Sequence, residues 1–278
     1  MSDAPNANQA AFWNDAAGRT WVEAQDPLDR QLEPLGRRGM AALAPAAGER
    51  VLDIGCGAGA TSLALAEAVG PRGEVLGVDI SAPLLDAARR RARGVANLRF
   101  AEADAQTYTF EAGAFDAAFS RFGVMFFADP AAAFGNIRRA LRPDGRLAFV
   151  CWRKPEESPI ITLPMQAAIP HLPEPPPPAT PAAPGPFAFA DPDRVRGILQ
   201  TAGFKTIDLT PHDEKVGGGD LEAVVALAFK IGPLGALLRE TPHLRPKVEA
   251  AVRAAMAAHD TPDGVKLNAA VWIVTARA

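Results

Sequence analysis

Three closely spaced glycines follow the apolar run that begins at Val51 in the stretch VLDIGCGAGATSLAL. Each glycine costs conformational entropy on folding, so Gly55, Gly57 and Gly59 favour a ligand that approaches the backbone itself. A glycine loop between a strand and a helix can hold an anion or a nucleotide, because its N–H groups and the helix N-terminus carry partial positive charge. Asp79 lies about 20 residues beyond the loop, where an acidic side chain can accept hydrogen bonds from ribose hydroxyls.

The spacing of this loop fits two kinds of cofactor. Gly55, Gly57 and Ala60 match the G-x-G-x-x-G/A fingerprint of dinucleotide-binding proteins. They also match the glycine loop of the class I S-adenosylmethionine (SAM) methyltransferases. The glycines alone therefore leave NAD and SAM open.

Two further motifs strengthen the resemblance to class I SAM methyltransferases. VLDIGCGAG resembles the first motif of that family, GVDIS the second and AEADAQ the third. The resemblance implies that Asp79 binds the ribose, that Ile80 lies against the adenine, and that Asp104 and the Ala105 N–H bind the adenine edge. Asp53 is expected either to order the loop or to contact the ligand directly, and the sequence leaves both roles open. The full set of cofactor-site residues expected from the resemblance is Trp13, Trp21, Asp53, Gly55, Cys56, Gly57, Gly59, Asp79, Ile80, Asp104, Ala105 and Ser120.

A narrower resemblance concerns the stretches FDAAFSRFGVMFF and ALRPDGRLAFVCW. They are similar to the fourth and fifth strands of the ubiquinone- and menaquinone-biosynthesis methyltransferases, and the match covers residues 49–152 closely. The resemblance implies in-line transfer of the sulfonium methyl to a small, apolar or aromatic, quinol-like acceptor. An NAD-dependent oxidoreductase and a non-catalytic SAM-binding protein remain the alternatives.

The elements that position these motifs alternate between short apolar strands and helices of 10–15 residues. This rhythm indicates an α/β protein with a Rossmann-like, seven-stranded, mostly parallel sheet and helices on both faces. The last two strands are expected to insert differently from the first five. The expected strands are 49–55, 73–80, 98–104, 114–120, 146–152, 204–211 and 265–278, and the expected helices are 60–70, 81–94, 129–145 and 191–203, with two more over roughly 220–240 and 244–259.

Four segments are expected along the chain. They are an N-terminal helical cap (1–48), a SAM-binding core (49–154), a proline-rich excursion (155–190), and the end of the core (191–278) with a helical insertion over 219–262. Residues 155–186 hold 12 of the 26 prolines, so this segment is expected to be extended rather than helical. Whether it forms a lid or a homodimer interface stays open.

The acceptor is expected beyond the carboxyl ends of the strands, where Ser120, Arg121, Phe122 and Trp152 lie. Arg121 either holds a polar substrate or pairs with a carboxylate, and Trp152 either lines the pocket or belongs to the core. Trp13 and Trp21 lie in a segment that either covers the cofactor as a lid or docks as ordinary helices.

The sequence does not identify a catalytic base. The histidines all lie outside the core motifs, at 171, 212, 243 and 259. The spacing of Cys56 and Cys151 matches no zinc site, so no metal is expected.

The composition is that of an ordinary globular protein of 278 residues, with a net charge of −3 that argues against a nucleic-acid partner. Two cysteines make no disulfide framework, which favours a reducing cytoplasm. We expect neither a signal peptide at the N-terminus nor a transmembrane segment.

Overall fold

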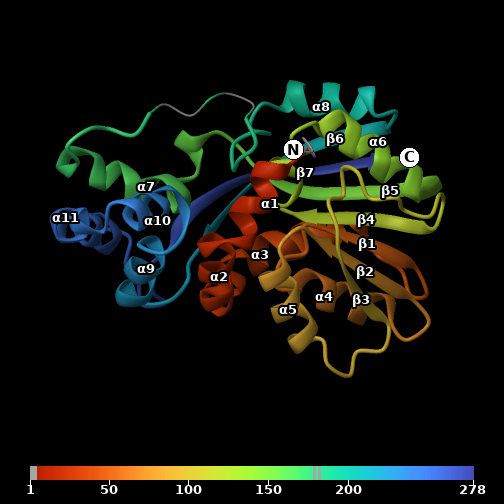
Figure 1. The fold of residues 1–278 in the computed structure, drawn as a ribbon, viewed down its shortest axis with the longest axis horizontal. Coiled ribbons are helices and arrows are strands. Elements are labelled where there is room, and N and C mark those ends of the chain that lie inside the picture. Colours follow the sequence, from red (N-terminus) through yellow and green to blue (C-terminus); the bar gives the residue numbers. More distant parts are fainter. Residues whose placement is uncertain (1–4, 178–179, 181–182) are drawn as a thin grey trace.

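The computed structural model describes residues 5–177, 180 and 183–278. Its centre is one seven-stranded sheet with the order β3-β2-β1-β4-β5-β7-β6 (Figure 1). The first five strands are parallel, and β7 runs antiparallel between β5 and β6, which confirms the different insertion of the last two strands. The strands are β1 (Arg50–Ile54), β2 (Glu74–Asp79), β3 (Leu98–Glu102), β4 (Phe115–Arg121), β5 (Leu141–Trp152), β6 (Lys205–Val216) and β7 (Leu267–Arg277).

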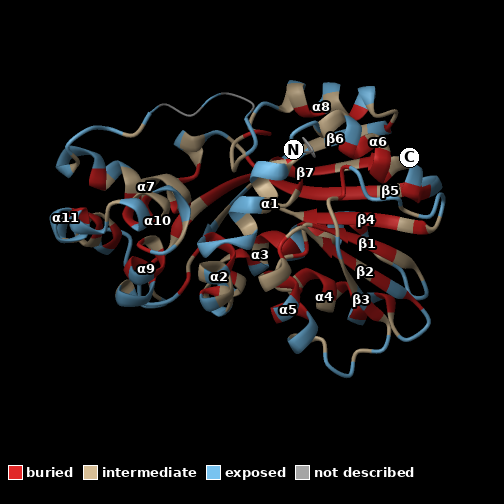
Figure 2. Cartoon of the chain, in the orientation of Figure 1, coloured by how far each residue is buried: buried red, intermediate tan, exposed pale blue. Residues whose placement is uncertain are grey.

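Helices cover both faces of this sheet. Figure 1 shows α6 (Pro130–Ala140) and α8 (Pro192–Thr201) on one face, and α3 (Gln25–Leu43), α4 (Ala60–Val69) and α5 (Ala82–Arg91) on the other. The central strands between these layers are almost wholly buried (Figure 2), as a parallel sheet covered on both faces requires. The α/β class and the seven strands predicted from the sequence are confirmed.

Helix starts follow the expected caps. Ser81 accepts a hydrogen bond from Leu84 N, Asp129 from Ala132 N, and Asp191 from Asp193 N. The end of α6 differs from the prediction, which extended the helix to residue 145. The helix stops at Ala140, and residues 141–145 already belong to β5, whose register against β4 shifts at this point.

The prediction that residues 155–186 hold no helix is wrong. Helix α7 (Pro159–Ala168) lies inside this segment, between the single turns η2 (Pro155–Glu157) and η3 (Ile169–His171). Pro159 occupies the first turn, where a helix needs no N–H donor, and Pro164 removes one internal hydrogen bond. Burial of Ile160 and Ala168 offsets that loss.

A helical lobe stands beside the sheet, at the left of Figure 1. It contains α7, α9 (Leu221–Ala228), α10 (Gly232–Glu240), the turn η4 (Pro242–Leu244) and α11 (Arg245–Ala257). The expected helix over 220–240 is therefore two helices, bent by 58°. Within the described residues, no single helix has the length and apolarity to cross a membrane, although the bent pair α9–α10 meets those two criteria jointly.

Two short helices, α1 (Ala7–Asn14) and α2 (Ala16–Glu23), precede α3 and lie between the helical lobe and the glycine-loop side of the sheet (Figure 1). Every residue of α1 is exposed or half-buried, so the helix is held mainly by contacts of individual side chains. These contacts belong to the site described next.

Candidate active site

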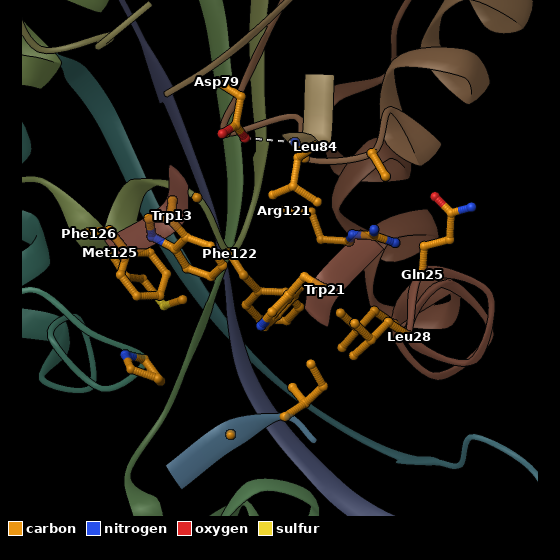
Figure 3. A pocket seen from close by; sticks show the side chains of 18 of the residues that line it. Trp13, Trp21, Gln25, Leu28, Asp79, Leu84, Arg121, Phe122, Met125 and Phe126 are labelled. Carbon is orange, nitrogen blue, oxygen red and sulfur yellow. Dashed lines mark hydrogen bonds between the residues drawn. The ribbon is translucent and has the colours of Figure 1, made fainter. Parts of the chain in front are cut away.

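One long cavity opens at the carboxyl ends of the parallel strands. Its walls come from the loops after β1, β2, β3 and β4, from the N-terminal helices, and from the helical lobe. This is the place where open α/β sheets bind ligands. Figure 3 shows Arg121, Gln25 and Leu28 on one side of the cavity and Trp13 and Phe126 on the other, with Phe122 and Trp21 between them.

The glycine loop presents its backbone to this cavity at Gly57. Gly57 has φ +54°, and among the described residues no atom lies within 4 Å of the position that a Cβ would take. Gly55, at φ +64°, also lines the cavity, and a Cβ at this position would lie only 2.7 Å from Gly123 Cα. Gly59 does not line the cavity: its Cβ position lies 3.0 Å from Ala88, so this glycine permits close helix packing.

Asp53 and Ser120 lie behind the cavity wall. Asp53 is fully buried, and its Oδ2 accepts hydrogen bonds from Thr61 Oγ1 at 2.7 Å and Ser62 Oγ at 2.6 Å. Burial raises the pKa of Asp53 to about 6, and Oδ1 has no hydrogen-bond partner among the described residues. Ser120 accepts from Gly123 N at 3.2 Å. The geometry favours the loop-ordering role for Asp53, one of the two alternatives left open by the sequence.

Asp79 lines the cavity beside the glycine loop. One carboxylate oxygen accepts from Gly57 N at 2.8 Å and the other from Ser81 N at 2.9 Å. Burial raises the pKa of Asp79 and raises that of the neighbouring Cys56 thiol well above its usual range. Ile80 follows on the same wall.

Asp104 and Ala105 lie on the wall after β3 and meet the N-terminal segment there. Asp104 Oδ1 accepts from Asn6 Nδ2 at 2.9 Å, and Asn6 Oδ1 accepts from Ala128 N at 2.6 Å. Asn6 thus joins the loops after β3 and β4 to the start of α1.

Hydrogen bonds of Asn14 and an aromatic cluster around Trp13 hold the other end of α1. Asn14 donates to Ile80 O at 2.8 Å and accepts from Ala82 N at 2.9 Å, while Trp13 O accepts from Ser81 Oγ at 2.8 Å. The Trp13 ring packs edge-on against Trp21 (5.3 Å between centroids) and Phe126 (5.5 Å). Both tryptophans line the cavity, so these helices form part of its wall.

Arg121, at the end of β4, pairs with a carboxylate, as one sequence alternative proposed. Its Nη2 lies 3.3 Å from Asp29 Oδ1, and Asp29 Oδ2 lies 2.8 Å from Arg91 Nη2. Arg91 also donates to Ala58 O in the glycine loop. Asp29 and Arg121 both line the cavity, so the ion pair forms part of its wall near the loop.

Phe122 and Trp152 form a stacked pair on the cavity wall. Their ring centroids lie 4.3 Å apart with an interplanar angle of 8°. Phe122 holds φ +63°, which is uncommon for an aromatic residue and aims its ring from the β4 turn onto Trp152. Trp152 is 5% exposed, so it belongs to both the core and the wall.

The far end of the cavity is apolar. It is lined by Ile160 and Pro164 from α7, Val224 and Leu227 from α9, Leu234 from α10 and Met256 from α11. The four histidines all lie away from the lining, and His212 pairs instead with Glu214 on β6 at 2.9 Å. Within the described residues, no group of three or more His, Cys, Asp and Glu side chains is placed to hold a metal ion.

Several wall residues carry no recognisable signal in the sequence. Asn6, Gln25 and Asp29 all line the cavity, yet each comes from the N-terminal helices, far along the chain from the strand motifs. Only the tertiary contacts of α1 and α3 bring them to the site.

Comparisons with known proteins agree with this geometry. A family model described as a methyltransferase domain matches residues 51–145. The chain is 38% identical to aklanonic acid methyltransferase of Streptomyces sp. (strain C5) over 152 residues, which are 51% of this chain and 68% of the relative. It is 44% identical to demethylmenaquinone methyltransferase of Thermus thermophilus over 104 residues, 37% of this chain and 46% of that protein.

The fold has solved counterparts as well. The structure of Haemonchus contortus phosphoethanolamine N-methyltransferase 2 with SAM superposes with a TM-score of 0.59 at 16% identity, over 96% of this chain and 59% of that one. At this identity the likeness concerns the fold alone. The 38% identity across two thirds of the first relative, with the matching methyltransferase domain, shows that the chain belongs to the SAM-dependent methyltransferases.

Proposed function

We propose that this chain transfers the methyl group of SAM to a small, apolar acceptor of aromatic or quinol-like character by in-line displacement. The proposal rests on one observation: a single cavity joins the glycine-loop wall at one end to an apolar chamber at the other. Such a cavity holds a polar donor and an apolar acceptor side by side, and alignment of two reactants contributes about 7–11 kcal/mol to a rate.

The residues on the first wall fit the donor. Gly57 leaves open space over its backbone, Asp79 offers oxygens for ribose hydroxyls, and Asp104 offers a carboxylate for the adenine amino group. Arg121 and Asp29 lie at the glycine-loop end, where opposite charges suit the carboxylate and ammonium of the amino-acid part. When bound, SAM supplies an electrophilic methyl group on a sulfonium.

The residues on the second wall fit the acceptor. The stacked Phe122 and Trp152 rings give a flat surface, and α7, α9, α10 and α11 add aliphatic side chains. Two relatives are named for an acid and for a quinone, as aklanonic acid methyltransferase and demethylmenaquinone methyltransferase, and these names support an acceptor of this character. The N-terminal helices exclude water from the space between donor and acceptor.

A calorimetric titration tests the donor site directly. Asp79→Ala is expected to weaken SAM binding by about 1–3 kcal/mol, because hydrogen bonds to a buried carboxylate are lost. Asp263→Asn, in an exposed turn, is the control and leaves the affinity unchanged. An unaltered affinity in Asp79→Ala would show that the ribose is bound elsewhere. Release of S-adenosylhomocysteine in a screen of phenols, quinols and amines tests the transfer itself.

A further inference from the structure

The acceptor end of the cavity differs in its chemistry from the donor end. The lining from α7, α9, α10 and α11 is aliphatic, and the stacked Phe122 and Trp152 complete it. Among the residues that the structure describes, the ionisable side chains that line the cavity are Asp29, Cys56, Asp79, Asp104 and Arg121. All five come from α3 or from the loops and strand ends of the donor wall.

The four charged side chains each have a partner within the protein, and the proposed function assigns them to the donor. Asp79 accepts two backbone N–H groups, and Asp104 accepts from an amide side chain and from Gln106 N. Asp29 lies between the guanidiniums of Arg91 and Arg121. Burial raises the pKa of the Cys56 thiol well above its usual range, so this group stays protonated. A general base must reach the proton that it removes, and the described acceptor wall offers no such group.

On the basis of the proposed function, we infer that the acceptor enters with its reacting group already ionised, as a carboxylate or as the oxyanion of an acidic phenol or enol on an apolar body. The oxyanion supplies the electron pair of the new bond to the methyl carbon. The carbon–sulfur bond breaks, and its electron pair stays on sulfur. An anion and a cation become two neutral products, and no proton is transferred.

The low dielectric constant of the apolar chamber strengthens the attraction that holds an anionic acceptor beside the sulfonium. Two opposite unit charges 4 Å apart attract by about 1 kcal/mol in water but by about 4 kcal/mol at an effective dielectric constant of 20. With Arg121 paired to Asp29, the sulfonium becomes the counter-charge for an anionic acceptor. An unactivated alcohol would need a base, which the described acceptor wall does not offer. An ammonium acceptor would be repelled by the positive charge of the sulfonium.

Three naphthalene probes that share one ring system test the inference: 4-nitro-1-naphthol, 1-naphthol and 1-naphthalenemethanol. Formation of S-adenosylhomocysteine is expected to follow acidity, with the nitronaphthol turned over at neutral pH and the alcohol not at all. For 1-naphthol, kcat/KM should rise about tenfold per pH unit up to the pKa of the free naphthol. The Asp29→Asn variant should change the height of this profile and not its position.

A binding measurement gives a second readout that needs no turnover. The absorbance of bound 4-nitro-1-naphthol reports its ionisation, and sinefungin is a cationic analogue of SAM with no methyl to transfer. The ratio of ionised to neutral probe at fixed pH should be about tenfold higher with sinefungin than with S-adenosylhomocysteine, which is one pKa unit.

Three results would overturn the inference. They are methylation of 1-naphthalenemethanol at a rate like that of 1-naphthol, a 1-naphthol profile that levels off well below the pKa of the free compound, and a nitronaphthol that binds the sinefungin complex neutral or not at all. Failure of the proposed function is a separate outcome, because it would appear as a lack of SAM binding in calorimetry.

Discussion

Arg121 and Asp29 join the end of β4 to helix α3, with Nη2 of the arginine 3.3 Å from Oδ1 of the aspartate. The Arg121 side chain is 15% exposed and that of Asp29 is 23% exposed, so the pair is shielded from bulk solvent yet open to the cavity. Arg91 holds the other Asp29 oxygen and the glycine loop together. The pair therefore links the N-terminal helices to the donor wall.

This link leads to a prediction about the donor's amino-acid end. Arg121→Ala should weaken binding of S-adenosylhomocysteine about 10- to 150-fold, because a charge-assisted hydrogen bond contributes about 1.5–3 kcal/mol. Binding of 5′-methylthioadenosine, which lacks the carboxylate and ammonium, should change little. Calorimetry with both ligands makes the comparison, and Arg89→Ala, an exposed position on α5, is the control. Equal losses for the two ligands would place Arg121 elsewhere.

The hydrogen bonds of Asn6 and Asn14 predict how firmly α1 is held against the cavity wall. Asn6 and Asn14 each bridge α1 to strand-end loops, and each hydrogen bond contributes about 0.5–1.5 kcal/mol. The double variant Asn6→Ala/Asn14→Ala loses all four bonds, about 2 kcal/mol or more, and should therefore exchange the amide hydrogens of α1 and α2 about 30-fold faster or more, while exchange in β1 and β4 stays the same.

The control for this experiment lies on the same helix. Asn8 is exposed, and no hydrogen bond of its side chain is present among the described residues. Asn8→Ala should leave the exchange of α1 unchanged. Equal acceleration by both variants would mean that loss of an asparagine, rather than loss of the bridges, loosens the helix.

The position of the strand-end residues on the cavity wall was largely predictable from the sequence. Gly55, Gly57, Asp79 and Asp104 lie at strand ends, and parallel strands bring their carboxyl ends to one edge of a sheet. Short-range spacing together with topology is enough to place such residues. Gly59 shows the limit of this reasoning, because a glycine that admits Ala88 has the same spacing as one that admits a ligand.

The N-terminal contacts were not predictable. Asn6 meets Asp104 across 98 positions of the chain, and Arg121 meets Asp29 across 92. No periodicity encodes such pairs. Helix α7 was missed for another reason. The prediction considered only the hydrogen bonds that prolines remove from a helix. The burial of Ile160 stabilises the helix through contacts with residues outside the segment.

The stacked pair predicts a split between acceptor and donor binding. Phe122→Ala removes the ring that faces Trp152 and should raise KM for 1-naphthol several-fold, since stacked aromatic pairs contribute about 0.5–1.5 kcal/mol beyond burial. The affinity for SAM should stay within about twofold, because the cofactor contacts proposed above lie at other positions. Phe122→Gly separates the effect of losing the ring from the effect of backbone strain, since glycine adopts φ +63° without strain. A loss of SAM affinity in both variants would contradict the assignment.

Asp53 predicts a pH dependence of stability with a definite sign. Burial raises the pKa of Asp53 to about 6 from its ordinary value of 3.8, so the folded chain holds the proton more tightly than the unfolded chain. Its contribution to stability is therefore lost as pH rises between these two values and is constant above. The free energy of unfolding of wild type minus that of Asp53→Asn should fall by about 2–3 kcal/mol from roughly pH 4 to pH 7. Urea unfolding at both pH values measures this difference. Thr61→Val is the control, because it removes one hydrogen bond to Asp53 but leaves the titrating carboxyl group in place. The free energy of unfolding of Thr61→Val minus that of Asp53→Asn should therefore still fall over this pH range. A pH-independent difference would mean that Asp53 titrates alike in the folded and unfolded states.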